Sequence, residues 1–158
     1  MNLYLDIETD FDRQITIIGL YARDLGVIQL SQPDISRTAL LRVLPRTARL
    51  YTFNGFCFDL PCIKAALNVD LRSRFESIDL RFVCQRLGWR GGQKHIEQQL
   101  GIERKLPGLD GRDAIQLWSR WSRWRDQAAL TTLFQYNRED LLNMSRIRAA
   151  VRRTGVGC

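Results

Sequence analysis

The chain has 158 residues, of which 45% are hydrophobic and 26% are charged. These fractions are ordinary for a globular protein and exclude a disordered or low-complexity chain, and the length suits one domain with its own core. Because no apolar run is long enough to span a bilayer, a membrane protein is excluded, and the N-terminus has no signal-peptide pattern.

The net charge is +7 and the isoelectric point is near 9.7, with arginine supplying most of the positive charge. A basic surface favours a polyanionic partner such as nucleic acid, although genome composition or colloidal stability can give the same charge. Since no cysteines have the C-x-x-C spacing of a metal or redox motif, we expect reduced thiols and a cytoplasmic protein. The cysteines are Cys57, Cys62, Cys84 and Cys158.

The beginning of the chain predicts three strands, because apolar runs there are separated by polar turns. In the first run, Leu3, Leu5 and Ile7 alternate with other side chains. A polar Arg23-Asp24 turn predicts a hairpin between the second and third strands. The three predicted strands are Leu3–Thr9, Ile15–Ala22 and Gly26–Leu30.

Helical patterns and short extended runs alternate along the rest of the chain. Two further strands are predicted over Leu50–Phe53, which ends at an Asn-Gly turn, and over Glu76–Leu80. The first predicted helix has Asp34 or Ser36 as its cap. The predicted helices are Ser36–Leu44, Asp59–Leu67, Arg81–Leu87, Gln93–Leu100, Asp110–Trp121 and Leu130–Arg152.

This order of elements predicts an α/β fold. Three antiparallel strands followed by alternating helices and strands form a mixed central sheet flanked by helices. Because neither a repeat nor a low-complexity linker divides the sequence, we expect one domain over residues 1–153 and a frayed tail over 154–158.

Acidic residues occur at three places where the predicted elements would bring them together. Asp6 and Glu8, in LYLDIET, are two apart on a strand and therefore point to the same face. Tyr136 and Asp140, in YNRED, are four apart on the last helix and share one of its faces. Asp59 begins a helix that follows the Asn-Gly turn. Converging carboxylates repel one another, so such a cluster predicts a divalent-cation site.

The residue types in this cluster indicate which metal it would bind. Oxygen ligands without histidine or thiolate partners suit Mg²⁺ or Mn²⁺ rather than Zn²⁺. Two such cations roughly 4 Å apart can promote an in-line displacement at phosphorus. Tyr136 is a poor general base, because tyrosine has a pKa of about 10, so we expect it to orient the attacking water.

Each member of the cluster also has an ordinary structural explanation. Asp6 and Glu8 could end a strand in solvent, and Asp59 could be a helix N-cap. Asp140 could pair with Arg138 or Arg146. Each explanation is sufficient for one residue. The cluster is explained without a metal site only if all of these explanations are correct together.

The order and spacing of these motifs resemble the DEDD superfamily of 3′–5′ exonucleases, which has the ribonuclease H-like fold. The Tyr-x-x-x-Asp motif is that of its tyrosine subgroup, the DEDDy (DnaQ-like) exonucleases. The segments GGQKHIEQQLGIERKLPGLDGRDAIQLW and LFQYNREDLLNM are similar to the YprB-type predicted exonuclease branch. The resemblance covers nearly the whole chain, roughly residues 1–150. It implies that the metal ligands are Asp6, Glu8, Asp59 and Asp140, and that Tyr136 orients water.

The resemblance implies a function as well. It is that of a 3′–5′ exonuclease that uses two divalent cations, Mg²⁺ or Mn²⁺, to release nucleoside monophosphates from the 3′ end of single-stranded DNA or RNA. Two alternatives remain open, a structure-selective endonuclease of the same fold and a non-catalytic nucleic-acid-binding module. A protein partner in nucleic-acid repair or processing could supply the substrate.

Residues near these motifs are candidates for substrate binding. Asn54, Gly55 and Phe56 form a turn before Asp59, where glycine lets the backbone approach a nucleotide and an aromatic ring can stack on a base. The alternatives are an ordinary turn and a core phenylalanine. Lys94 lies in the first turn of a predicted helix, where it would bind phosphate or remain solvated.

Overall fold

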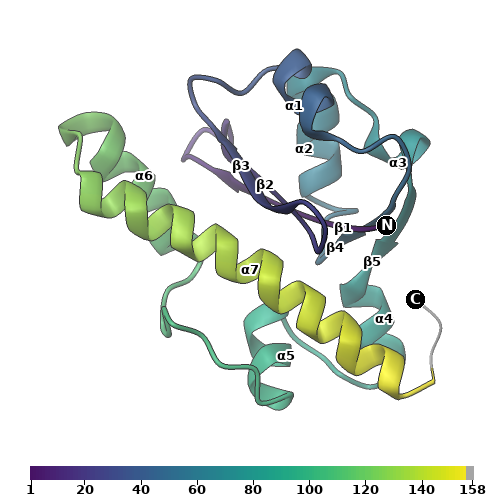
Figure 1. Ribbon diagram of the computed structural model, residues 1–158. Coiled ribbons are helices and arrows are strands. Elements are labelled where there is room, and N and C mark those ends of the chain that lie inside the picture. Colours follow the sequence, from purple (N-terminus) through teal and green to yellow (C-terminus); the bar gives the residue numbers. More distant parts are fainter. Residues whose placement is uncertain (156–158) are drawn as a thin grey trace.

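The computed structural model describes residues 1–155. Its centre is a five-stranded sheet with the strand order β3-β2-β1-β4-β5 (Figure 1). β1 pairs antiparallel with β2, and β2 with β3, whereas β4 runs parallel to both β1 and β5. The mixed sheet predicted from the sequence is therefore confirmed. The strands are β1 (Asn2–Thr9), β2 (Ile15–Ala22), β3 (Gly26–Ser31), β4 (Arg49–Thr52) and β5 (Glu76–Asp79).

Helices cover both faces of the sheet, so the domain has three layers (Figure 1). The core under α1 and α2 is formed by aliphatic side chains of β1 and β2. On the opposite face, α6 and α7 pack on the other side of the same strands, and the last turns of α7 pack against α4 and α5. The helices are α1 (Arg37–Val43), α2 (Asp59–Leu67), α3 (Leu71–Arg74), α4 (Leu80–Arg86), α5 (Gln93–Gln99), α6 (Gly111–Trp124) and α7 (Gln127–Arg153).

The predicted elements are all present, with small differences at their ends. Ser36, not Asp34, caps α1, because its side chain accepts a hydrogen bond from the amide of Ala39. The single turn of α3 was not predicted, since four residues are too few to show a helical period. Helix α6 runs one turn beyond its predicted end and stops where Arg125 adopts a left-handed φ of 54°.

The alternation of β1 separates the core from the acidic residues. Leu3, Leu5 and Ile7 are buried in the cluster under α1 and α2. The intervening side chains of Asp6 and Glu8 therefore point to the opposite face, which α7 covers. One strand thus contributes to the hydrophobic core on one side and to a polar centre on the other.

Helix α7 is long because its inner face is buried over most of its length. Leu141, Met144, Ile147 and Val151 recur at three- and four-residue spacing, and they and Leu133, eight residues before Leu141, are buried against the sheet and its neighbouring helices. The same face carries buried polar residues, which are Asn137, Asp140 and Asn143. A helix stabilised by such packing holds these polar groups at fixed positions.

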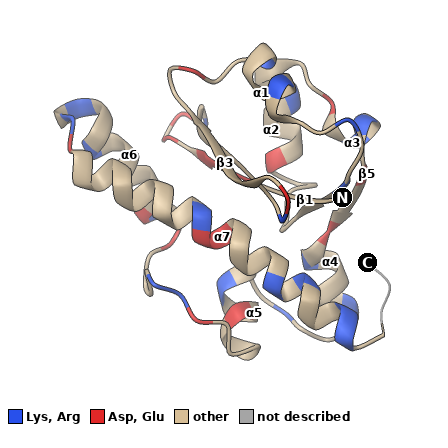
Figure 2. Cartoon of the chain, viewed as in Figure 1, with Lys and Arg blue, Asp and Glu red and all other residues tan. Residues whose placement is uncertain are grey.

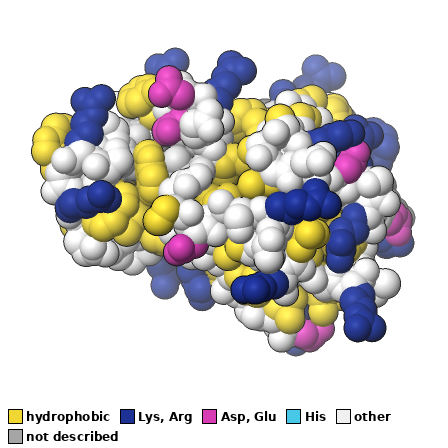
Figure 3. Space-filling model, turned by 90° about the horizontal axis from the view of Figure 1, so that it is seen from above, with side chains coloured by type: hydrophobic (Ala, Val, Ile, Leu, Met, Phe, Trp, Pro, Cys, Tyr) yellow, Lys and Arg dark blue, Asp and Glu magenta, His cyan; other side chains and the backbone are white. Residues whose placement is uncertain are grey.

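On the face seen from above (Figure 3), basic side chains outnumber acidic ones. Lys and Arg side chains are spread over the face seen in Figure 3, with few acidic side chains between them. In Figure 2, the acidic residues of helix α7 lie near its middle, and basic residues follow them toward its C-terminal end. Within residues 1–155, the structure has no helix with the length and apolarity that a membrane crossing requires.

The predicted tail is described only at its beginning. Thr154 and Gly155 continue from α7 in a turn whose amides donate to Val151 and Arg152 carbonyls. The rest of the predicted tail, residues 156–158, lies outside the described part of the chain.

Candidate metal centre

Three carboxylates from the two ends of the sequence meet where α7 crosses β1. Asp6 and Glu8 come from the strand and Asp140 from the helix, and one oxygen of each lies within 4.8 Å of the others. Glu8 and Asp140 are buried, and Asp6 is half-buried. The strand spacing and the helix spacing predicted from the sequence thus bring these side chains to one point.

The cluster is electrostatically unfavourable without a cation. Burial raises the pKa of Asp6, and the neighbouring charges of Glu8 and Asp140 raise it further. Burial and the charge of Asp140 likewise raise the pKa of Glu8. Among the described residues, no donor reaches Oε1 of Glu8, although this oxygen is buried. A buried carboxylate oxygen without a donor is expected where a cation completes the site.

Asp59 is not one of the three carboxylates that lie within 4.8 Å of one another, but it contacts the strand that carries Asp6 and Glu8. It is the first residue of α2, and the residue at the N-cap position is Phe58. Its Oδ1 accepts a hydrogen bond of 3.0 Å from the amide of Ile7, which lies between Asp6 and Glu8. Burial raises the pKa of Asp59 to about 7, although the hydrogen bond with Ile7 opposes this shift. Asp59 therefore remains a predicted fourth ligand that the structure positions against the same strand.

Tyr136 and Lys94 form one wall of the centre. The Lys94 ammonium donates to the Tyr136 hydroxyl at 2.7 Å and to the carbonyl of Leu109, and its nitrogen lies 4.3 Å from the centroid of the Tyr136 ring. Burial and the charges of the three nearby carboxylates raise the pKa of Tyr136, so its hydroxyl stays protonated at neutral pH. Lys94 thus points at the centre instead of into solvent.

A cavity of about 320 Å³ opens onto these groups. Phe58 at the start of α2 and Ile115 on α6 contribute apolar walls, and the carboxylates contribute the polar one. A volume at the low end of the range for small-molecule sites suits one nucleotide unit. The lining residues are Asp6, Ile7, Glu8, Thr9, Phe58, Gly111, Ile115, Tyr136 and Asp140.

The donor set fits a hard divalent cation. The three gathered side chains offer carboxylate oxygens alone, which suits Mg²⁺ or Mn²⁺. The raised pKa values and the oxygen of Glu8 without a donor are both relieved when a cation binds.

A family model described as "RNase_H superfamily" matches residues 3–152. The chain belongs to the ribonuclease H superfamily. A comparison with curated proteins finds no match. Membership agrees with the observed mixed sheet flanked by helices and implies a nucleic-acid substrate, and the acidic cluster is compatible with divalent-metal binding.

The turn before Asp59 in this ribonuclease H-like domain is held by Asp79. The Asp79 carboxylate accepts hydrogen bonds from the amides of Asn54 at 2.8 Å and Phe56 at 3.0 Å, and it also caps α4. A Cβ atom on Gly55 would overlap the side chain of Thr52, so packing requires glycine here. Asp79 therefore both caps a helix and supports the turn that leads to Asp59.

The side chains of Asn54 and Phe56 in this turn contact other parts of the fold and do not line the cavity. Asn54 adopts a left-handed φ of 64°, and its Oδ1 accepts from Arg81 at 2.6 Å. The Phe56 ring is half-buried against the core, with the Arg72 guanidinium 4.6 Å from its centroid. Phe58, which the turn also positions, is 37% exposed and is the phenylalanine that lines the cavity.

Asn137 also supports the centre and was not found from the sequence. Its Nδ2 donates to Oδ2 of Asp6 at 2.8 Å, while its Oδ1 accepts from Gln29 of β3 at 2.9 Å. The two contacts fix the orientation of the Asn137 amide, so that a residue of α7 holds the Asp6 carboxylate in place. The only signal in the sequence is its place next to Tyr136, which does not show which way the amide points.

We expect Gly19→Ala to destabilise the protein and disturb this support. A Cβ atom on Gly19 of β2 would overlap Oδ1 of Asn137 and approach Cδ1 of Leu141 to 2.8 Å. Such overpacking should lower the free energy of unfolding by roughly 1–3 kcal/mol, measured by urea denaturation. Gly92→Ala is the matched control, since no atom lies within 4 Å of its added Cβ. Equal stability of the two variants would contradict the prediction.

Arg104 and Glu97 are two further residues that sequence reasoning missed. Asp140 pairs with Arg104, and not with Arg138 or Arg146 as the ordinary explanation supposed. Arg104 lies 36 residues before Asp140, in a segment between two helices. A charged residue in a connecting segment gives no periodic signal, so its partner could not be predicted.

Proposed function

We propose that this protein is a metal-dependent 3′–5′ exonuclease that releases nucleoside monophosphates from the 3′ end of single-stranded DNA or RNA. Within the superfamily it would belong to the tyrosine subgroup, DEDDy, and to its YprB-type branch. Two cations, Mg²⁺ or Mn²⁺, would be held by Asp6, Glu8, Asp59 and Asp140. The single observation that carries the proposal is the meeting of Asp6 and Glu8 with Asp140, beside Tyr136 one helical turn earlier.

The cations, when bound, would activate water and stabilise the leaving 3′-oxygen. The protein's own groups then have definable tasks. The phenol of Tyr136 does not act as a base, because its raised pKa keeps the hydroxyl protonated at neutral pH. Since Lys94 already donates to the Tyr136 oxygen, the hydroxyl proton is directed elsewhere and can hydrogen-bond to the attacking water or to a phosphate oxygen.

The shape of the cavity favours an end-acting enzyme over an endonuclease. It has room for about one nucleotide, and apolar Phe58 and Ile115 flank the carboxylates. An aromatic side chain at such a place can stack on a base of any identity. We therefore assign base stacking to Phe58 and keep Asn54, Gly55, Phe56 and Lys94 as predicted contributors to substrate binding.

The remaining charge of the protein supports a polyanionic substrate. With a net charge of +7, phosphate contacts at many surface positions would give non-specific affinity for a strand. A protein partner in nucleic-acid repair or processing remains part of the proposal, as a means of delivering the strand end to the cavity.

The test is hydrolysis of 5′-labelled single-stranded DNA and RNA oligonucleotides in Mg²⁺, in Mn²⁺ and in EDTA. We expect a ladder of products shortened from the 3′ end, in the presence of either cation and not in EDTA. Asp6→Ala should be inactive. Asp24→Ala, which removes an exposed aspartate from the turn between β2 and β3, should keep activity.

The pattern of products separates the candidate functions. Internal fragments without a ladder would replace the proposal with an endonuclease. Binding of both polymers without cleavage, by folded protein, would replace it with a non-catalytic binding module.

A further inference from the structure

A buried ion pair lies directly behind Asp140. The guanidinium of Arg104 donates to Glu97 through Nε at 2.5 Å and through Nη2 at 2.9 Å. Nη2 also contacts Oδ1 of Asp140. The side chains of Arg104 and Glu97 are 9% and 1% exposed. One guanidinium therefore connects a fully buried carboxylate on α5 to a member of the metal centre on α7.

Glu97 is a rigid anchor for this guanidinium. Besides the two bonds from Arg104, its carboxylate accepts from Gln93 at 2.9 Å and from Asn143 at 3.1 Å. Gln93 donates in addition to the backbone carbonyl of Asp140 at 2.8 Å. A buried carboxylate with four donors has a single favourable orientation, and it transmits that orientation to Arg104.

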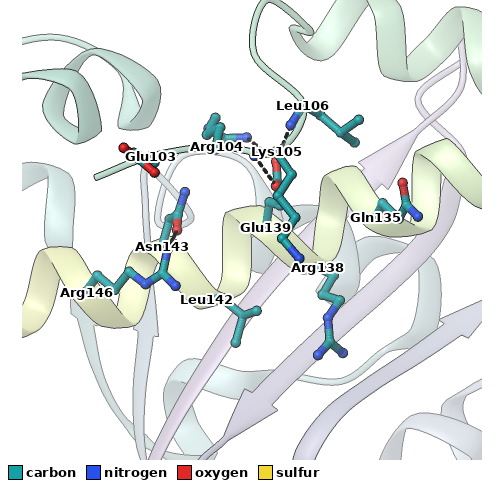
Figure 4. A pocket seen from close by; sticks show the side chains of 10 residues that line it. All are labelled: Glu103, Arg104, Lys105, Leu106, Gln135, Arg138, Glu139, Leu142, Asn143 and Arg146. Atoms are coloured by element: carbon teal, nitrogen blue, oxygen red, sulfur yellow. Dashed lines mark hydrogen bonds and ion pairs between the residues drawn. The ribbon is translucent and has the colours of Figure 1, made fainter. Parts of the chain in front are cut away.

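The backbone around Arg104 is fixed as well. Both oxygens of Glu139 accept hydrogen bonds from the following segment, from the amide of Lys105 at 2.6 Å and from that of Leu106 at 3.2 Å (Figure 4). Glu139 thereby holds this segment on α7, next to Asp140. Hydrogen bonds thus fix both the side chain of Arg104 and the backbone that follows it. We therefore expect the guanidinium to keep one position.

The charges of Arg104 and Glu97 indicate that Arg104 contributes mainly by orienting the Asp140 carboxylate. Arg104 and Glu97 together are neutral, so the pair adds no net charge to the metal centre. A planar guanidinium with several fixed donors instead sets the direction of each carboxylate that it contacts. The contact with Asp140 engages one of its two oxygens and leaves the other to bind a cation.

We propose that Arg104, anchored by Glu97, is a positioning residue that fixes the Asp140 carboxylate for cation binding. The inference rests on the proposed metal site but not on the reaction catalysed there. Groups that orient a metal ligand typically change metal affinity by about 10–100-fold when they are removed.

The sign of the change in Mn²⁺ affinity tests this assignment. If Arg104 acted through its charge, Arg104→Gln would bind Mn²⁺ more tightly, and Arg104→Lys would bind it as the wild type does. If Arg104 positions Asp140, both variants should have a dissociation constant about 10–100-fold larger than that of the wild type. Glu97→Gln should weaken binding too. The constants are measured by titration with Mn²⁺, following the free ion by electron paramagnetic resonance without nucleic acid.

Arg146→Gln is the matched control. Arg146 is an exposed arginine of α7 that donates to Asn143 at 2.8 Å, and its replacement removes the same unit of charge from the protein as Arg104→Gln does. Its affinity for Mn²⁺ should match that of the wild type. Circular dichroism confirms folding, and Arg104→Lys, which keeps the charge, serves if Arg104→Gln does not fold.

Unchanged affinity in Arg104→Lys, or tighter binding in Arg104→Gln, would overturn the inference. A wild-type protein that binds Mn²⁺ but hydrolyses no nucleic acid would instead count against the proposed function alone. The two failures are therefore distinguishable.

Discussion

Glu8→Gln is expected to abolish hydrolysis and, at the same time, to stabilise the metal-free protein. Glu8 is 7% exposed, burial and nearby carboxylates raise its pKa, and one of its oxygens has no donor among the described residues. Glutamine keeps the shape but removes the charge, so the free energy of unfolding should rise by about 1 kcal/mol or more. Loss of a metal ligand should lower turnover at least roughly a thousandfold.

The two effects are measured on the same preparation. Urea denaturation in EDTA gives the free energy of unfolding, and oligonucleotide hydrolysis in Mn²⁺ gives turnover. Addition of Mn²⁺ should stabilise the wild type and leave Glu8→Gln almost unchanged, since only a state that binds the ion gains from it. Glu103→Gln, at an exposed position, is the control and should change neither quantity. A destabilised Glu8→Gln protein would mean that Glu8 serves the fold and not a cation.

Such opposite effects are the signature of a site kept for function. Natural proteins retain locally unfavourable groups where binding or catalysis needs them, and the surrounding structure compensates for them. Here the compensation is visible in Asn137, which donates to Asp6, and in Arg104, which donates to Asp140. Neither neighbour reaches the buried Oε1 of Glu8.

Local sequence patterns were sufficient to predict the fold and the acidic face. Alternation in β1 placed Leu5 and Ile7 in the core and Asp6 and Glu8 on the other side, as the structure has them. The four-residue spacing of Tyr136 and Asp140 put both on the inner face of α7. These predictions succeeded because strand and helix periods fix side-chain directions without knowledge of tertiary contacts.

The contacts that could not be predicted are made by residues in segments too short or too irregular to show a helix or strand periodicity. Lys94 and Arg104 reach the centre from a helix of seven residues and from the connection that follows it, so the direction of each side chain is set by tertiary packing. The sequence shows that a lysine or an arginine is present but not which group of the centre it contacts. For the same reason, the alternative explanation for Asp140 considered only arginines of its own helix, whereas its actual partner lies 36 residues away.

The stability of the metal-free protein should fall as the pH rises from about 5 to 8. Asp59 is ordinarily ionised above pH 3.8, but burial raises its pKa in the folded state to about 7. The folded protein therefore binds more protons than the unfolded chain in this interval. Stability linked to Asp59 is fully present below its unfolded pKa and is lost as the pH passes its folded pKa. Asp6, Glu8 and Asp140 act in the same direction, since their pKa values are also raised.

The interval from pH 5 to 8 isolates this effect. The carboxylates of Asp70, Asp110 and Asp126 have pKa values lowered by hydrogen bonds, so they are ionised throughout. Asp59 alone should account for a decrease on the order of 2 kcal/mol in the free energy of unfolding. Urea denaturation in EDTA at several pH values measures it, and Asp59→Asn should make the profile less steep, with the remaining slope due to Asp6, Glu8 and Asp140.

Saturating Mn²⁺ should reverse the slope, because a cation binds the deprotonated carboxylates and its affinity grows as protons leave. The pH at which the two profiles separate then marks where the carboxylates exchange protons for metal. Profiles that rise with pH in EDTA and in Mn²⁺ alike would show that the four carboxylates are already compensated within the fold. The metal site itself would then be in question, since relief of their repulsion is the physical reason to expect a cation there.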